Sequence, residues 1–427
     1  MSQITLPSEL ILHIIECLIP ADPPVIITRE HEITRTLLNL TLVCKLVSRT
    51  ARQLLVKHCL QIDSPDRLDQ VLQSGILTRE QPQLPTQTSL FLSPYTSDEF
   101  DMPPTVHAIN TLSTLLCTSL TRLVINISLH LVYLEEDVTP VCPTLRSAFS
   151  RMTALQEFTC VRDELFLVTE PHPQLLAGQE NPLAVYGYPQ PQQMVWTLWP
   201  NLRKLALYNV AVDHAKFLDG LRGCKNLTHL VLVRPHELAE EVDPVYRGID
   251  EGFLPKLERL IIVNTGLGFL HTSPFDEGTH RASFVGRLDA LRRNRGDVGA
   301  DEGSVASYIS LREPFGRDDE DMDICQEWLA KQAISGKLWE ASDERQDMLQ
   351  EFVMRETSYA DTGNHAPSAS KQAKLSPTLE PDRPHASDVI LRRDTWDLGP
   401  RNFYASADVC YRAYGRLSQP FQAYLRR

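Results

Sequence analysis

The chain has 427 residues, of which 42% are hydrophobic, and its formal net charge is −13. This length predicts two or three folded units joined by linkers. The negative charge argues against a general nucleic-acid-binding protein, because the phosphate backbone would repel the chain. We find no signal segment and no apolar run of roughly 18 residues. Nine scattered cysteines without a Cys-x-x-Cys pair are typical of a reducing compartment. We therefore expect an intracellular protein, cytoplasmic or nuclear, that binds neither nucleic acid nor a membrane.

Residues 1–60 predict a small helical domain. Leu10, Ile11, Ile14, Ile15 and Leu18 recur at helical spacing, and Pro7 and Glu9 suit the first turn of the helix that they form. A second amphipathic stretch, from about Thr36 to Leu55, continues into a third helix. The proline-containing insertion Pro20–Glu32 between them is predicted to be an exposed loop.

This segment resembles an F-box of the kind found in filamentous fungi. The resemblance rests on the run from Leu6 to Ile11, Leu-Pro-x-Glu-Leu-Ile, and on Leu42-Val43-Cys44-Lys45. It implies a three-helix domain that docks on the Skp adaptor of a cullin-based ubiquitin ligase. The adaptor-binding residues would be Leu6, Pro7, Leu10, Ile11, Ile14, Ile15, Leu18, Leu40, Val43, Cys44 and Val47.

Two features of this chain depart from the F-box pattern. Val47 stands where the family usually has Trp, and Pro20–Glu32 lengthens a connection that is usually tight. An ordinary helical hairpin packed on its own core is the alternative interpretation. A partner or the rest of the chain must cover the apolar stripes, because two short helices cannot bury both.

Residues 61–101 predict a helix, Ser64–Leu77, followed by a connecting loop. Residues 102–275 contain a repeated pattern of Leu-x-x-Leu-x-Leu/Ile, which resembles a degenerate leucine-rich repeat and implies an α/β solenoid. The strict copies start at Leu120, Leu202, Leu227 and Leu257, and a looser copy starts at Leu155. Their spacing is irregular, so a mixed α/β domain with similar buried strands remains the alternative.

In the solenoid interpretation, alternate residues of each strand face the core and the others face an exposed sheet. The inward residues would be Leu205, Leu207, Leu230, Leu232, Leu260 and Ile262, and the outward ones Lys204, Ala206, Tyr208, His229, Val231, Arg259 and Ile261. We take Lys204, Tyr208, His229 and Arg259 as candidate contacts to a protein substrate. Val231, Val233, Ile261 and Val263 favour another reading, in which the strands are covered on both faces and bind nothing there.

The rest of the chain is less regular. The Pro- and Gln-rich stretch between Pro171 and Pro200 is either a functional or disordered loop, or an insertion whose Trp196 and Trp199 fill the adjacent core. Residues 276–395 are predicted to be acidic and partly disordered, with one or two helices, Asp323–Ile334 and Ser342–Arg355. Residues 396–427 form an aromatic-rich C-terminal segment.

No motif for catalysis, a metal or a cofactor is found; Asp213-His214, His229 and His236 are better explained as ordinary surface or core residues. We therefore expect no enzymatic activity and no cofactor. The predicted function is that of the substrate-recognition subunit of a Skp-cullin-F-box type ubiquitin ligase. Its partners would be the Skp adaptor, a cullin through that adaptor, and an unknown protein substrate. The alternative is a free-standing repeat scaffold whose N-terminal helices cap the solenoid.

Overall fold

An eight-stranded parallel sheet organises the part of the chain that the computed structural model describes. The described residues are 6–20, 23–77, 87–95, 102–127, 141–162, 165, 167, 193–238, 240, 242, 249–265, 281–295, 306–311 and 321–341. Spatial order follows chain order, and each strand pairs in parallel with the next. The strands are β1 (Leu60–Ile62), β2 (Thr88–Leu92), β3 (Leu120–Ile125), β4 (Glu157–Cys160), β5 (Lys204–Tyr208), β6 (His229–Val233), β7 (Arg259–Thr265) and β8 (Ala306–Leu311). The combination of helices and strands predicted for the chain is confirmed.

One register row explains why the repeated leucines form this sheet. Residues in the same position of successive strands lie side by side and face the same core. The row runs through Leu60, Leu90, Leu123, Phe158, Leu205, Leu230, Leu260 and Ala306. The residues predicted to face inward, Leu205, Leu207, Leu230, Leu232, Leu260 and Ile262, are all fully buried there. The repeated pattern therefore marks strands correctly.

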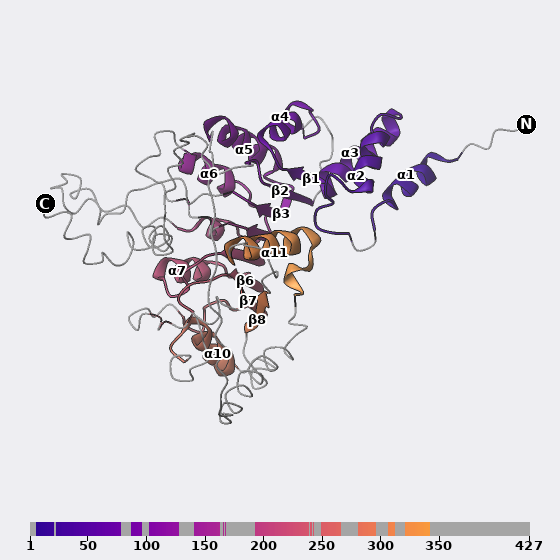
Figure 1. Ribbon diagram of the computed structural model, residues 1–427. Coiled ribbons are helices and arrows are strands. Elements are labelled where there is room, and N and C mark those ends of the chain that lie inside the picture. Colours follow the sequence, from indigo (N-terminus) through magenta and orange to yellow (C-terminus); the bar gives the residue numbers. More distant parts are fainter. Residues whose placement is uncertain are drawn as a thin grey trace, which may run out of the picture. The chain divides into compact units, whose positions relative to one another are not determined.

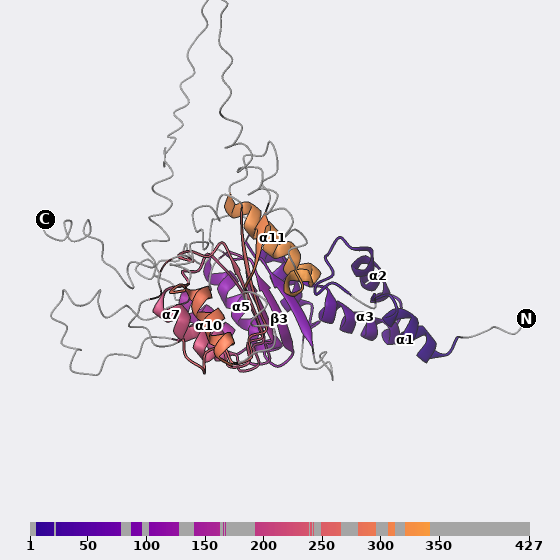
Figure 2. The ribbon, with the colours of Figure 1, turned by 90° about the horizontal axis from the view of Figure 1, so that it is seen from below.

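Helices cover both faces of the sheet, but unequally (Figure 1). On the first face lie α4 (Pro65–Gln73), α5 (Met102–Leu116), α6 (Val141–Ser150), the short 3-10 helix η3 (Val195–Leu198), α7 (Ala215–Gly223) and α10 (Phe284–Arg295). The opposite face carries α11 (Asp321–Ser335) and the 3-10 helix η4 (Lys337–Trp339). Figure 2 shows α11 on one side of the strands and α5, α7 and α10 on the other. The predicted helix Asp323–Ile334 is thus confirmed as α11.

Three N-terminal helices form a smaller core of their own. They are α1 (Ser8–Glu16), α2 (Glu32–Leu40) and α3 (Lys45–His58). Ile15, Leu37, Val47, Ala51 and Leu55 are buried together between them. The C-terminal end of α3 leads into β1, and α3 also contacts β2. A three-helix unit therefore stands beside the first strands of the sheet (Figure 1).

The sequence prediction missed three strands. Residues 61–101 contain the predicted helix, as α4 with Ser64 accepting a hydrogen bond from the Arg67 N–H, but also β1 at their start and β2 in place of a loop. A further strand, β8, lies in the segment predicted to be acidic and partly disordered. The first leucine of the pattern is replaced by Lys57 before β1 and by Gln87 before β2. The Leu-x-x-Leu-x-Leu/Ile pattern does not identify β1 and β2, because its first leucine precedes the strand and is not needed for strand pairing.

The insertion between α1 and α2 is not simply an exposed loop. Ile26 and Ile27 are each 1% exposed, and they belong to different cores. Ile26 packs in the core under α11, whereas Ile27 packs in the core of the three helices. The Ile27 N–H donates to the His58 carbonyl at 2.7 Å, and the Ile26 N–H donates to the Ile334 carbonyl at 3.2 Å. The prediction was wrong here because it rested on the prolines alone. The burial of two adjacent β-branched residues, Ile26 and Ile27, holds this part of the insertion against both cores.

The two tryptophans of the Pro- and Gln-rich stretch fill the core. Trp196 is fully buried, and the Trp199 indole N–H donates to the Phe149 carbonyl at 2.8 Å. The Trp199 ring lies 4.8 Å from the Phe158 ring. The predicted helix Ser342–Arg355, the rest of the region beyond residue 341 that is predicted to be partly disordered, and the C-terminal aromatic segment lie outside the described residues. Among the helices of the described ranges, none combines the length and apolarity needed to cross a bilayer.

Candidate functional site

Large exposed apolar side chains gather on the three-helix unit. In the described part of the chain, all seven such side chains fall between residues 6 and 46. We call them the N-terminal apolar surface: Leu6, Leu10, Ile14, Leu38, Leu42, Val43 and Leu46. Their exposed fractions run from 45% at Leu46 to 85% at Leu42. Contiguous exposed apolar area is typical of interaction sites, so this surface is the first candidate.

The first group of this surface lies along α1. Leu10 and Ile14 are four residues apart, so they share one side of the helix, and the exposed Leu6 precedes its first turn, whereas Ile11 and Ile15 turn toward α3. The helix begins after Pro7, whose ψ of 143° is extended, and Glu9 places a carboxylate in the first turn. α1 is therefore apolar on two sides, and its own chain covers only one of them.

The second group lies at the corner between α2 and α3. Leu38, Leu42 and Leu46 keep a spacing of four residues across the break between the helices. The corner is held by its own hydrogen bonds: the Leu42 N–H donates to the Asn39 carbonyl at 3.0 Å, and the Thr41 hydroxyl donates to the Leu38 carbonyl at 2.6 Å. The exposed side chains therefore project from an ordered turn.

The residues predicted to contact an adaptor divide into three classes. Leu6, Pro7, Leu10, Ile14, Val43 and Cys44 are exposed. Ile11, Leu18 and Leu40 are partly buried against the small core. Ile15 and Val47 are 4% and 6% exposed and belong to that core, so they support the helices from inside. Residue-type patterns could not separate Ile14 from Ile15, because both are aliphatic and adjacent.

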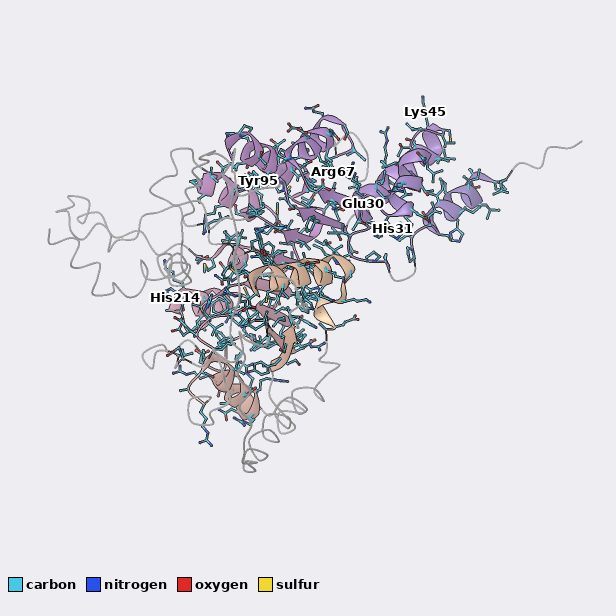
Figure 3. All side chains as sticks on the ribbon, viewed as in Figure 1. Glu30, His31, Lys45, Arg67, Tyr95 and His214 are labelled. Atoms are coloured by element: carbon cyan, nitrogen blue, oxygen red, sulfur yellow. The ribbon has the colours of Figure 1, made fainter. Side chains whose placement is uncertain are left out.

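Sequence reasoning left three exposed residues out of the predicted contact set: Leu38, Leu42 and Leu46. Their regular spacing of four residues was a usable signal in the sequence, where the predicted helical stretch ran through the corner. Lys45, which begins α3 and is labelled in Figure 3, lies next to this group and is exposed. Because α3 has fourteen residues and joins β1 at its other end, this corner is about 20 Å along the helix from the sheet.

The second candidate surface is the face of the sheet that carries α11. Tyr208, Ala206, Val231 and Ile261 were predicted to line an exposed sheet, but all four are buried in the core under α11. Burial also raises the pKa of Tyr208 to about 12. This part of the sheet therefore agrees with the second interpretation of the sequence, in which the strands are covered on both faces. α11 supplies the cover through Cys325, Leu329 and Ala333.

The polar residues at the start of the strands remain partly accessible. Register places Arg122, Glu157, Lys204, His229 and Arg259 in one row across β3 to β7. Glu157 Oε1 lies 3.4 Å from Arg122 Nε and 3.5 Å from Lys204 Nζ. Burial, with Lys204 next in effect, lowers the pKa of His229, so its imidazole is neutral at pH 7 beside these cations. Of the four candidate substrate contacts, the structure thus brings Lys204, His229 and Arg259 together and buries Tyr208.

The end of the described chain contacts this row. Trp339 Nε1 donates to Glu157 Oε2 at 3.2 Å, and Lys204 Nζ lies 5.6 Å from the centroid of the Trp339 ring. The Arg259 guanidinium donates to the carbonyls of Trp339 and Ala341, at 3.2 and 2.8 Å. Trp339 is 6% exposed. The row therefore holds an aromatic side chain and two main-chain carbonyls at once.

The described residues show no constellation for metal binding: no group of three or more His, Cys, Asp or Glu side chains is placed to hold an ion. His214, labelled in Figure 3, lies at the N-terminus of α7, where its Nδ1 accepts from the Lys216 N–H at 3.3 Å. His236 Nε2 lies 2.6 Å from Asn209 Oδ1. These histidines have structural hydrogen bonds within the fold.

Comparison with known proteins gives no family for this chain. A scan against protein-family models finds no match, and a search of curated proteins finds no significant match.

Proposed function

We propose that this chain is the substrate-recognition subunit of a Skp-cullin-F-box type ubiquitin ligase. The N-terminal apolar surface docks on the Skp adaptor, and the sheet region holds a protein substrate. The single observation that carries the proposal is that an ordered three-helix unit exposes apolar side chains at the motif positions Leu6, Leu10 and Val43. The F-box resemblance of the same residues supplies the identity of the partner.

The size of the surface is adequate for such a complex. Fully burying an aliphatic side chain is worth about 2 kcal/mol, and these seven side chains are already about half buried. Their burial against a partner gives on the order of 7 kcal/mol of gross driving force, before the contribution of partly buried neighbours. Association and ordering costs reduce this sum. The result is a specific complex that can exchange partners.

The alternative, in which these helices only cap a repeat scaffold, has one observation in its favour. α3 contacts β1 and β2 at the first edge of the sheet, as a cap would. However, a capping element keeps its outer side polar for solubility. Here the side of the unit that lies away from its own core carries the N-terminal apolar surface. Capping therefore explains α3 but leaves the apolar side chains of α1 and of the α2–α3 corner unexplained.

The test is the affinity of the full chain for a purified Skp adaptor. Leu10→Asp with Ile14→Asp places two charges in the middle of the α1 group, and both positions are more than half exposed. We expect the double variant to fold and to bind the adaptor at least about 100-fold more weakly, which corresponds to about 3 kcal/mol. A charge reversal outside this surface, Arg52→Asp on the exposed side of α3, is the matched control and retains affinity. Unchanged affinity of the double variant would refute the docking assignment.

A further inference from the structure

Residues 337–341 pack in the core under α11 through Leu338 and Trp339, and they also make polar contacts of the kind that recognise a peptide. The row of Glu157, Lys204 and Arg259 binds one indole and two main-chain carbonyls of this segment. Main-chain carbonyls are common to every peptide, and the indole supplies one specific anchor. By contrast, α11 packs on the sheet mainly through apolar side chains, among them Cys325, Leu329 and Ala333. The polar contacts thus concentrate where the chain leaves α11.

This segment is joined to α11 through a residue with a distinct backbone conformation. Gly336 has φ of +82°, in the left-handed region, and it ends the helix before η4 begins. A rotation at Gly336 would lift Lys337–Ala341 off the row and leave Cys325 and Leu329 in place on the sheet. The backbone at Gly336 therefore divides the cover into two parts, α11 and the five residues that follow it.

Two further side chains of the row, Arg122 and His229, are available to a longer bound segment. Arg122, which pairs with Glu157, has a side chain that is 45% exposed. Its register position continues the row beyond Trp339 toward β2. His229 stands between Lys204 and Arg259 in the register; its Nδ1 lies 2.9 Å from the Thr228 hydroxyl oxygen, and its lowered pKa keeps the imidazole uncharged at pH 7, so Nε2 is the nitrogen left for a further hydrogen bond. A longer bound segment would find further partners at both positions.

We propose that Lys337–Ala341 occupies in cis a peptide-binding site formed by Glu157, Lys204 and Arg259, and that a protein partner with an exposed tryptophan displaces it. The partner's indole would donate to Glu157 under the Lys204 ammonium, and its next main-chain carbonyls would accept from Arg259. This inference rests on the proposed substrate-holding role of the sheet and names the class of segment that the sheet recognises. The internal segment then acts as a competitor, since its tether gives it an effective concentration in the millimolar range.

The test uses a synthetic peptide with the sequence of residues 336–342, Gly-Lys-Leu-Trp-Glu-Ala-Ser, carrying a fluorescent label. Its binding to the full chain is followed by anisotropy. The open variant, Leu338→Ser with Trp339→Ser, removes the two buried side chains of η4 and vacates the site. We expect it to bind the peptide at least tenfold more tightly than the wild-type chain. Lys337→Ala, an exposed change in the same segment, is the control and should bind as weakly as the wild type.

Two further comparisons test which groups of the peptide and of the protein make the contacts. Replacing the tryptophan of the peptide by alanine, or adding Arg259→Ala to the open variant, should each reduce affinity at least tenfold. Absence of peptide binding by the folded open variant, or binding that is independent of the peptide's tryptophan and of Arg259, overturns the proposal. Binding of the Skp adaptor is measured on the same samples, because the open variant leaves the N-terminal apolar surface intact. Loss of one interaction without the other distinguishes the two proposals.

Hydrogen exchange of the wild-type chain provides an answer that does not require the open variant to fold. The Glu340 N–H donates to the Lys337 carbonyl at 3.1 Å, so its exchange reports on η4. We expect this amide to exchange at least tenfold faster than those in the middle of α11 and in β6. Equal protection of η4, α11 and β6 would show that residues 337–341 are a fixed part of the core, and would contradict the proposal.

Discussion

Two adjacent isoleucines in α1 have opposite environments. Ile14 is 57% exposed, whereas Ile15 is 4% exposed within the small core. We expect Ile15→Ala to lower the free energy of unfolding by about 2–4 kcal/mol, since it removes buried methyl groups and leaves a cavity. Ile14→Ala should change it by less than about 0.5 kcal/mol. Urea titrations of both variants measure the difference.

Adaptor affinity should rank the same two variants in the reverse order. Ile14→Ala removes a contact of the proposed interface and should weaken binding, while any folded Ile15→Ala protein keeps the interface side chains. Equal destabilisation by the two substitutions would contradict the burial of Ile15. Equal affinity of wild type and Ile14→Ala would contradict the interface.

Gly336 carries a conformational requirement. Its φ of +82° disfavours any residue with a Cβ, and a Cβ there would lie 3.1 Å from Val25 Cγ2. Gly336→Ala should therefore lower the free energy of unfolding by about 1–2 kcal/mol. The variant with both Val25→Ala and Gly336→Ala removes the contact but keeps the backbone strain. Thermal or urea unfolding should show only partial recovery relative to Val25→Ala alone; full recovery would mean that the φ value is without cost.

His58 makes stability depend on pH. Burial, with smaller effects from Lys57 and Arg122, lowers its pKa from 6.5 to about 4. The unfolded chain therefore takes up a proton between pH 6.5 and pH 4 that the folded chain does not, so stability falls as pH decreases through this window. After allowance for partial exposure, the contribution is about 1 kcal/mol at pH 5.

The comparison with His58→Gln isolates this effect from other titrating groups. The decrease in the free energy of unfolding between pH 7 and pH 5 should be smaller in the variant, by about the same 1 kcal/mol. Urea titrations at the two pH values provide the measurement. An identical decrease in both proteins would show that His58 titrates normally in the folded chain.

At the scale of elements, the sequence predicted the strands better than their surroundings. Leu205, Leu230 and Leu260 identify strands because each fills the same core position in the register. The pattern says nothing about the opposite face, where the apolar Val231 and Ile261 require a cover that lies far along the chain, in α11. Long-range coverage of this kind is set by tertiary packing, which local periodicity cannot report. The contacts of Trp339 with Glu157 and Arg259 were unpredictable for the same reason.

α11 is a structural cover for the sheet. Leu329 is fully buried against the strands, and we expect Leu329→Ala to lower the free energy of unfolding by about 2–4 kcal/mol. Glu327→Ala, on the exposed side of the same helix, is the control and should change stability by less than about 0.5 kcal/mol. Urea unfolding of both variants measures the two free energies of unfolding. If Leu329→Ala were as stable as the control, α11 would not be part of the core.

At the scale of the described molecule, adjacent residues connect two cores. Ile26 enters the core under α11 and Ile27 that of the three helices, and their N–H groups bond to Ile334 and His58. The insertion thus ties the unit that bears the N-terminal apolar surface to the cover of the sheet. From the sequence alone this insertion was a departure from the F-box pattern. In the structure it fixes where the three helices attach.

The central claim is that the Skp adaptor binds the N-terminal apolar surface. The most direct measurement is hydrogen exchange of the full chain with and without the purified adaptor. We predict slower exchange in two segments, residues 8–18 and 38–48, with β3 to β7 and α11 unchanged. Protection confined to the sheet or α11, or no protection in a mixture at concentrations where an F-box protein binds, would contradict the account.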